Sequence, residues 1–123
     1  FYSYVDRSRL YMQALDAGNR TSISLPLVTL VEKCAWNKEG SAVFCAVPTA
    51  IGGALPDEWY QGAHAFTDRL WRIDLADRVA TLVFDPRELA DEPMDMEALT
   101  LDSASDVIVF MNRLDGSLWS YDL

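Results

Sequence analysis

Two cysteines, Cys34 and Cys45, are the residues whose type and spacing most clearly indicate chemistry in this chain. A turn centred on Glu39 and Gly40 would place them directly opposite each other on two antiparallel strands. Opposed residues have Cβ atoms about 4.5–5.5 Å apart on one face of a sheet, which is near the reach of a disulfide. We therefore predict a Cys34–Cys45 disulfide, with two buried thiols as the alternative. A disulfide favours an extracytoplasmic location: periplasm, cell surface or medium.

His64 is the one histidine of the chain, so any histidine-based acid–base scheme would depend on it. No Gly-x-Ser-x-Gly nucleophile elbow is present, and neither cysteine has a base partner evident in the sequence. One histidine and two cysteines do not supply a plausible zinc ligand set, and a glycine-rich phosphate loop is missing. We therefore predict no catalytic residue, no metal site and no cofactor within this chain.

A long connection at residues 48–67 carries the candidate binding residues. Loops longer than about 12–15 residues are uncommon in compact domains and are often functional. This one holds Trp59, Tyr60 and Phe66, which are residue types that dominate interface hot spots. With Asp57 and His64 they form the predicted partner-binding set. The alternative is that the loop aromatics pack on the protein's own surface.

Net charge and the length of the apolar runs each exclude one class of function. The chain of 123 residues has 10 Lys and Arg against 19 Asp and Glu, for a net charge of -9. Because nucleic acids would be repelled, we predict no DNA or RNA binding. The longest apolar runs, such as Ala42–Val47, fall far short of the roughly 20 residues of a membrane-spanning helix. The acidic segment Asp85–Glu97 is predicted to be a solvated loop or helical turn, with a docking surface for a basic partner as the alternative.

An internal sequence repeat indicates the β-strands that position the cysteines and the long loop. Leu70–Leu75 and Leu118–Leu123 share the pattern Leu-Trp-x-(Ile/Tyr)-Asp-Leu and lie 48 residues apart, and Leu10–Asp16 is a weaker copy. Alternating apolar residues and turn signals predict short antiparallel strands around each copy. The expected strands are 30–36, 41–47, 68–74 and 79–84 in the middle unit, 96–101, 107–112 and 117–122 in the last, and 1–2, 10–15 and 21–25 in the first.

A repeat of four short antiparallel strands every 40–50 residues or so is typical of a β-propeller blade. The segment Ala35–Phe44, with its Asn-Lys-Glu-Gly-Ser turn before Ala-Val-Phe, resembles the WD40-like propeller repeat of the TolB type. Asn112–Trp119 is similar to that family's Asp-Gly-x-Leu-Trp hairpin. The chain is also similar to bacterial propeller proteins of uncharacterised function. This resemblance implies an all-β fold of antiparallel four-stranded blades, one complete and two partial.

The resemblance also implies a division of the chain. Residues 1–28 would be the end of a partial blade, 29–86 a complete blade with the inserted loop 48–67, and 87–123 an acidic connection followed by a partial blade. Propellers typically have four to eight blades, so we expect this chain to be a fragment of a longer protein.

For function, the resemblance implies a non-catalytic scaffold or protein-interaction module with unidentified protein partners, in an extracytoplasmic bacterial protein. Two alternatives stay open. One is a substrate-gating propeller domain of a hydrolase whose catalytic residues lie outside this chain. The other is a subunit of a surface or filament assembly that pairs through exposed blade edges.

Overall fold

The computed structural model describes residues 2–6, 9–16, 21–49, 61 and 65–123, with side-chain environments from Ser24 onward. Helix in this part of the chain is limited to the 3-10 turn η1 (Val31–Lys33) and the single-turn α2 (Pro86–Leu89), and neither is long and apolar enough to cross a membrane. The strands are β1 (Tyr2–Asp6), β2 (Arg9–Asp16), β3 (Thr21–Ser24), β4 (Cys34–Trp36), β5 (Ala42–Pro48), β6 (Asp68–Asp74), β7 (Val79–Phe84), β8 (Met96–Leu101), β9 (Val107–Asn112) and β10 (Ser117–Asp122).

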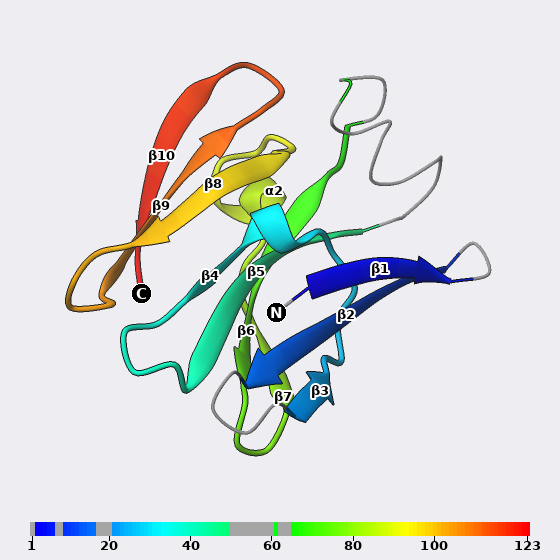
Figure 1. The fold of residues 1–123 in the computed structure, drawn as a ribbon. Helices are drawn as coiled ribbons and strands as arrows, with labels where there is room; N and C mark the ends of the chain where they lie inside the picture. The colour runs from blue at the N-terminus through cyan, green and yellow to red at the C-terminus, as the bar shows by residue number, and fades with distance from the viewer. Residues whose placement is uncertain (1, 7–8, 17–20, 50–60, 62–64) are drawn as a thin grey trace.

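The strands form three antiparallel sheets, each built from strands that follow one another in the sequence (Figure 1). Sheet A has the order β1-β2-β3, sheet B the order β4-β5-β6-β7, and sheet C the order β8-β9-β10. Among the described strands, each pairs only within its own sheet. The predicted all-β, antiparallel fold is therefore confirmed.

The predicted strands from residue 68 onward coincide with β6 to β10. The prediction for 30–36 was partly wrong, because residues 31–33 form η1 and only Cys34–Trp36 stay extended. The N–H of Lys33 donates to the carbonyl of Leu30 at 3.0 Å. Since side chains three residues apart are eclipsed in a 3-10 turn, Leu30 and Lys33 both become buried, with 1% and 0% exposure.

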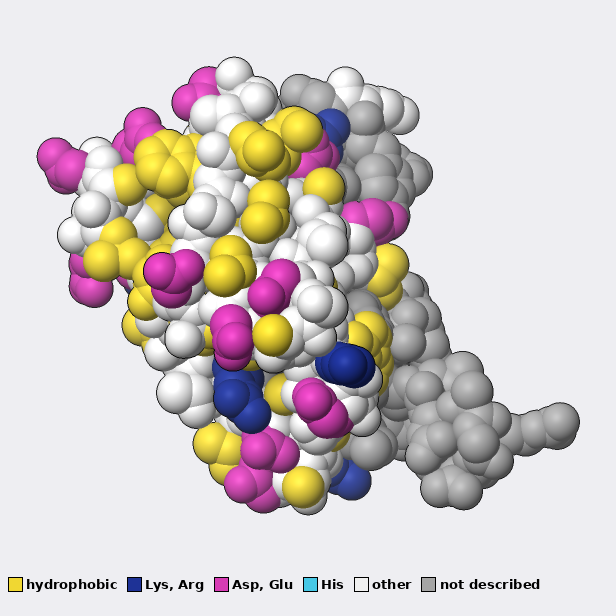
Figure 2. Space-filling view, turned by 90° about the vertical axis from the view of Figure 1, so that its left-hand side faces the viewer, with side chains coloured by type: hydrophobic (Ala, Val, Ile, Leu, Met, Phe, Trp, Pro, Cys, Tyr) yellow, Lys and Arg dark blue, Asp and Glu magenta, His cyan; other side chains and the backbone are white. Residues whose placement is uncertain are grey.

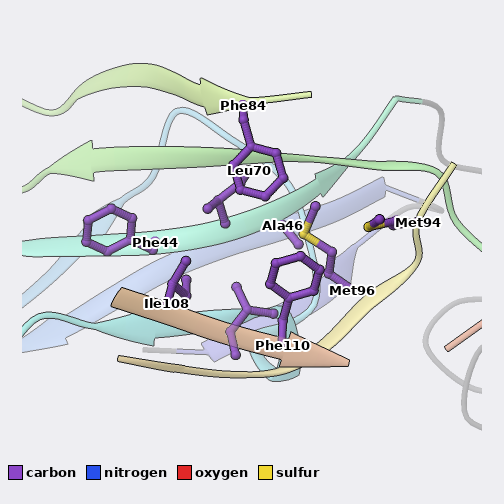
Figure 3. Close-up of a cluster of buried hydrophobic side chains, with 9 residues drawn as sticks. Phe44, Ala46, Leu70, Phe84, Met94, Met96, Ile108 and Phe110 are labelled. Carbon is purple, nitrogen blue, oxygen red and sulfur yellow. The ribbon is translucent and has the colours of Figure 1, made fainter. Parts of the chain in front are cut away.

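The larger hydrophobic core lies between sheets B and C (Figure 3). Phe44 and Leu70 of sheet B meet Ile108 and Phe110, which share one face of β9 because side chains alternate along a strand. Phe84, at the end of β7, closes this core with its ring centroid 6.1 Å from that of Phe110. Burying each of these large side chains contributes on the order of 1.5–3 kcal/mol, so this core holds the two sheets together.

The opposite face of sheet B is buried as well. Val43, Cys45 and Ile73 form a second core with Leu25, which follows β3 directly. Because successive residues of β5 point to opposite faces, both cores draw on the unbroken apolar run Ala42–Val47. The central strand β5 is therefore buried on both faces, whereas β7 is largely exposed.

The turns that precede β5 and β9 share one hydrogen-bonding pattern. The N–H of Asn37 donates across its turn at 3.0 Å, and the N–H of Asp102 does the same at 3.0 Å. In each case the side-chain oxygen of that residue also accepts from two backbone N–H groups at the far end of the turn. The positive φ of Gly40, 71°, recurs at Ser105, 59°, so the turn is retained without a glycine.

A second pair of turns, β6–β7 and β9–β10, is similar in local geometry although the two occupy different places in the repeat. The Oδ1 atoms of Asp77 and Asp115 each accept from the N–H two residues ahead, at 3.0 and 2.9 Å. The residue that follows the aspartate has positive φ in both turns: Arg78 at 60° and Gly116 at 74°. The turns before β5 and β9, which do occupy equivalent places, thus extend the internal repeat from sequence to backbone geometry.

Candidate functional site

Three buried charged side chains, Lys33, Asp68 and Asp95, form what we call the Lys33 cluster. The Nζ of Lys33 lies 2.5 Å from Oδ2 of Asp68 and 2.5 Å from Oδ1 of Asp95, and all three side chains have 0% exposure. Lys33 ends η1, Asp68 begins β6, and Asp95 directly precedes β8. The cluster therefore joins sheet B to sheet C at one end of their shared core.

Backbone groups complete the hydrogen bonding of this cluster. The ammonium of Lys33 also donates to the carbonyl of Met96 at 2.8 Å, so three acceptors match its three protons. Oδ2 of Asp68 accepts from the N–H of Met96 at 2.8 Å, and Oδ2 of Asp95 accepts from the N–H of Phe66 at 3.0 Å. Among the described residues, Oδ1 of Asp68 is the buried side-chain oxygen that lacks a partner.

Burial raises the pKa of Asp68 from 3.8 to about 6. Lys33 and the hydrogen bonds that stabilise the carboxylate oppose this rise, while the neighbouring carboxylate of Asp95 adds to it. Two carboxylates share one ammonium, so the fully ionised cluster has one negative charge in excess within a low-dielectric interior. A proton on Asp68 neutralises that excess.

The geometry of the Lys33 cluster suits structure rather than catalysis. An amine nucleophile needs a free electron pair, whereas all three protons of Lys33 are held by oxygen atoms. A general acid must reach its substrate, whereas the side chain of Asp68 has 0% exposure. What the cluster does in this arrangement is tie two sheets together.

The predicted disulfide is present between Cys34 of β4 and Cys45 of β5. The two residues are directly opposed in the strand register, with Cα atoms 4.1 Å apart. The register of the whole hairpin agrees with the turn assumed from the sequence, since Trp36 stands opposite Val43. The alternative of two buried thiols was wrong.

Of the predicted partner-binding residues, Asp57, Trp59, Tyr60 and His64 lie outside the described residues. Phe66 is described, and it is buried with 3% exposure. The Nζ of Lys33 lies 5.2 Å from the centroid of its ring, a distance at which an ammonium is attracted to an aromatic face. Phe66 therefore packs inside the protein, in agreement with the packing alternative for that residue.

The acidic segment Asp85–Glu97 contains a buried residue that the sequence analysis missed. Asp85 is partly exposed, at 14% for its side chain: it caps α2 by accepting from the N–H of Arg87 at 3.0 Å, and it pairs with Arg69 at 3.1 Å. Asp95 is instead buried in the Lys33 cluster. The available signal was an acid between Met94 and Met96 at the start of a strand, because a solvated acid rarely has two buried apolar neighbours.

A surface candidate lies on the side of sheet C that faces away from sheet B, which we call the outer face of sheet C. Leu118 of β10 stands opposite Met111 of β9, and both are exposed, at 72% and 36%. The next pairs on the same face set Ser120 and Asp122 against two valines of β9. Figure 2 views the molecule from this side and shows hydrophobic side chains with acidic ones between them.

A small apolar hollow lies at the other face of β10, between that strand and the end of β7. Its volume is about 170 Å³, and the residues that line it include Phe84, Leu89, Met94, Phe110, Trp119 and Tyr121. The strand β10 thus has the exposed Leu118 on one face and an apolar hollow beside the other.

Comparison of the chain with protein-family models, curated proteins and solved structures gives no match.

Proposed function

We propose that this chain is part of a β-propeller-type scaffold that binds protein partners and does not itself catalyse a reaction. Sheets A, B and C would be one partial, one complete and one partial blade. Three observations support this assignment: consecutive antiparallel strands within each sheet, face-to-face packing of sheets B and C, and the matching turns before β5 and β9. The partner-binding surface would be the outer face of sheet C.

The observation that carries this proposal is the exposed cross-strand pair Leu118 and Met111. Large contiguous apolar patches are typical of interaction sites, and the adjacent Leu118 and Met111 would form the centre of such a patch. Residues 96–123 add five acidic side chains and one basic one: Glu97, Asp102, Asp106, Asp115 and Asp122, with Arg113. A fitting partner therefore presents an apolar patch with a basic rim.

We also propose an extracytoplasmic location for the scaffold. The Cys34–Cys45 disulfide supports it, because such bonds persist mainly in the periplasm, on cell surfaces and in secreted proteins. The partners would then be envelope or surface proteins of the same cell, or proteins that meet it from outside.

Site-specific photo-crosslinking in the native cell tests the proposed function. A benzophenone amino acid replaces Leu118 or Met111 in the full-length protein, and a matched control carries it at Arg87, an exposed position on α2. We expect a discrete heavier adduct containing a second protein from the first two positions and none from position 87. Equal adducts at all three positions, or crosslinks confined to the same polypeptide, would contradict the proposal.

A further inference from the structure

The Lys33 cluster connects sheets B and C through hydrogen bonds that run in both directions. From the side of sheet B, the ammonium of Lys33 donates to the carboxylate of Asp95 and to the carbonyl of Met96. From the side of sheet C, the N–H of Met96 donates to the carboxylate of Asp68 at 2.8 Å. The N–H of Phe66, just before β6, donates to Asp95 at 3.0 Å. The contact between the sheets at this end therefore depends on two carboxylates and one ammonium.

The opposite end of the same interface is held by a weaker polar contact. There the turn between β4 and β5 meets the turn between β8 and β9, where the N–H of Lys38 donates to Oγ of Ser105 at 3.2 Å. This bond is exposed, so water competes for both of its groups. A change in the charge of the buried Lys33 cluster can therefore loosen one end of the interface while the strands within each sheet stay paired.

The two carboxylates of the cluster differ in how their oxygens are hydrogen-bonded. Oδ1 of Asp95 accepts from Lys33 and Oδ2 accepts from the N–H of Phe66, so both oxygens have a donor. Oδ2 of Asp68 accepts from Lys33 and from the N–H of Met96, whereas Oδ1 is buried and has no donor among the described residues. A charged carboxylate is stabilised by donors at its oxygens, so Asp68 is the acid whose charged form is less well satisfied.

A proton on Oδ1 of Asp68 fits this arrangement. Oδ2 then remains an acceptor for Lys33 and Met96, so no hydrogen bond between the sheets is lost. The cluster as a whole becomes neutral, and a buried hydroxyl without a partner costs far less than a buried charge without one. Ionisation of Asp68 restores the excess negative charge. The carboxylates of Asp68 and Asp95, which belong to opposite sides of the interface, then repel each other.

We propose that the Lys33 cluster is a proton-controlled latch between sheets B and C, closed when Asp68 is protonated and loosened when Asp68 ionises. Loosening separates the segment before β8 from the start of β6, and water then reaches that end of the core between the sheets. The inference goes beyond the proposed function, because it concerns the internal packing of the chain and requires no partner.

The direction of the pH effect follows from the pKa of Asp68. Burial raises this pKa from 3.8 to about 6, against the opposing effect of Lys33. Because the closed form binds the proton more tightly, its stabilisation is complete below about pH 4 and is lost as pH rises through about 6. The latch is therefore closed in acid and loosened near neutral pH.

Among the described residues, two elements supply the charges that act on Asp68. They are Lys33 of η1 and Asp95 of the segment before β8. Arg69, the next residue on β6, points to the other face and pairs with the carboxylate that caps α2. Arg113, directly after β9, approaches the cluster through its N–H, which donates to the carbonyl of Asp95 at 2.8 Å. β5 places an uncharged proline opposite Asp68.

Native-state hydrogen exchange on the full chain tests the latch. The amides of Phe66, Asp68 and Met96 report on the interface, because each donates across it. At pH 7 we expect these amides to be at least tenfold less protected than those of Val43 and Cys45 in the central strand β5. Their exchange should depend little on low concentrations of urea, since a local opening exposes little surface. Equal protection and an equal urea dependence in the two sets would mean that the sheets separate only on global unfolding, which would overturn the inference.

The pH dependence of the same amides gives the second readout. After correction for the intrinsic exchange rate, protection at the interface should rise about tenfold from pH 7 to pH 5, as a shift of the pKa from 3.8 to about 6 requires. Interface protection that does not change with pH would overturn the inference.

Two matched variants test whether Asp68 is the group that titrates. Asp68→Asn resembles the protonated side chain at every pH, and it leaves all other titratable groups in place, His64 included. We expect its interface amides to change in corrected protection by less than twofold between pH 5 and pH 7. Asp122→Asn removes an exposed carboxylate of β10 and should behave as the unaltered chain does. A pH effect that persists in D68N would overturn the inference.

Direct titration of the unaltered chain makes the test independent of how the variants fold. Carbon-13 NMR follows the carboxyl carbon of each aspartate as pH is changed. We expect the Asp68 signal to titrate with a midpoint near pH 6, together with the change in interface protection. A midpoint near the ordinary value of 3.8, or a titration of Asp95 in place of Asp68 near pH 6, would overturn the inference.

Discussion

Arg78 adopts in the β6–β7 turn the positive φ that Gly116 adopts in the β9–β10 turn, 60° against 74°. The two residues follow Asp77 and Asp115, which make the same hydrogen bond in their turns. A residue with a side chain is strained in this conformation, whereas glycine is not. The β6–β7 turn thus contains the less favourable residue, and the comparison suggests how to stabilise it.

Arg78→Gly should raise the free energy of unfolding by about 0.5–1 kcal/mol, because glycine adopts positive φ without a steric penalty. Urea denaturation measures the change. Arg78→Ala is the matched control: it removes the exposed guanidinium but keeps the strain, and it should change stability little. The reverse substitution, Gly116→Ala, should destabilise by a similar amount.

Lys33→Met should destabilise the protein by about 3–5 kcal/mol, because it leaves Asp68 and Asp95 buried without their cation. Chemical denaturation measures the loss, and Lys38→Met is a control for removing an exposed lysine. The double variant Lys33→Met/Asp68→Asn should be more stable than Lys33→Met alone, because only one buried carboxylate, that of Asp95, then lacks its cation. A double variant no better than the single one would contradict this account of the cluster.

Asp68 should make stability fall as pH rises through about 6. Its pKa is about 6 when folded and 3.8 in the ordinary exposed state, so the folded protein binds the proton more tightly. The stabilisation is therefore fully present below about pH 4 and is lost as pH rises through the folded pKa. Relative to Asp68→Asn, the unaltered protein should lose on the order of 2–3 kcal/mol between pH 4 and 7.

Comparison with D68N is needed because other carboxylates act in the opposite direction. Hydrogen bonds lower the pKa of Asp102 and of Asp115, so the stability they provide is lost as pH falls. Those contributions are common to both proteins and cancel in the difference. A difference that does not vary with pH would show that Asp68 has an ordinary pKa.

Replacing both cysteines by alanine should lower the free energy of unfolding by about 2–4 kcal/mol. The reason is that the disulfide restricts the unfolded chain by linking two residues that are 11 apart in the sequence. Thermal unfolding with and without reductant measures the same quantity in the unaltered chain. Thiol titration of the denatured, unreduced protein should find no reactive group. Two reactive thiols would contradict the disulfide.

The sequence was sufficient to predict most strands and the disulfide, because both depend on local patterns. Alternation of apolar residues and turn signals placed β6 to β10, and the turn at Glu39 and Gly40 fixed the opposition of Cys34 and Cys45. The strand predicted at 30–36 was too long, because a buried lysine required a 3-10 turn at its start.

The Lys33 cluster could not be predicted because it depends on the packing of two sheets. Lys33 and Asp95 are 62 residues apart, and no spacing rule connects a lysine in a turn to an acid before another unit's first strand. Charged residues are usually solvated, so the general expectation for both was exposure.

Each sheet consists of strands that are consecutive in the sequence, and this has a consequence for synthesis on the ribosome. Strand pairing in sheet B needs nothing beyond Phe84, so it can be complete before β8 has been translated. Until then, Phe44 and Leu70 have no covering layer. The nascent chain therefore passes through a stage in which a finished sheet presents an apolar face, and that stage ends when β9 is translated.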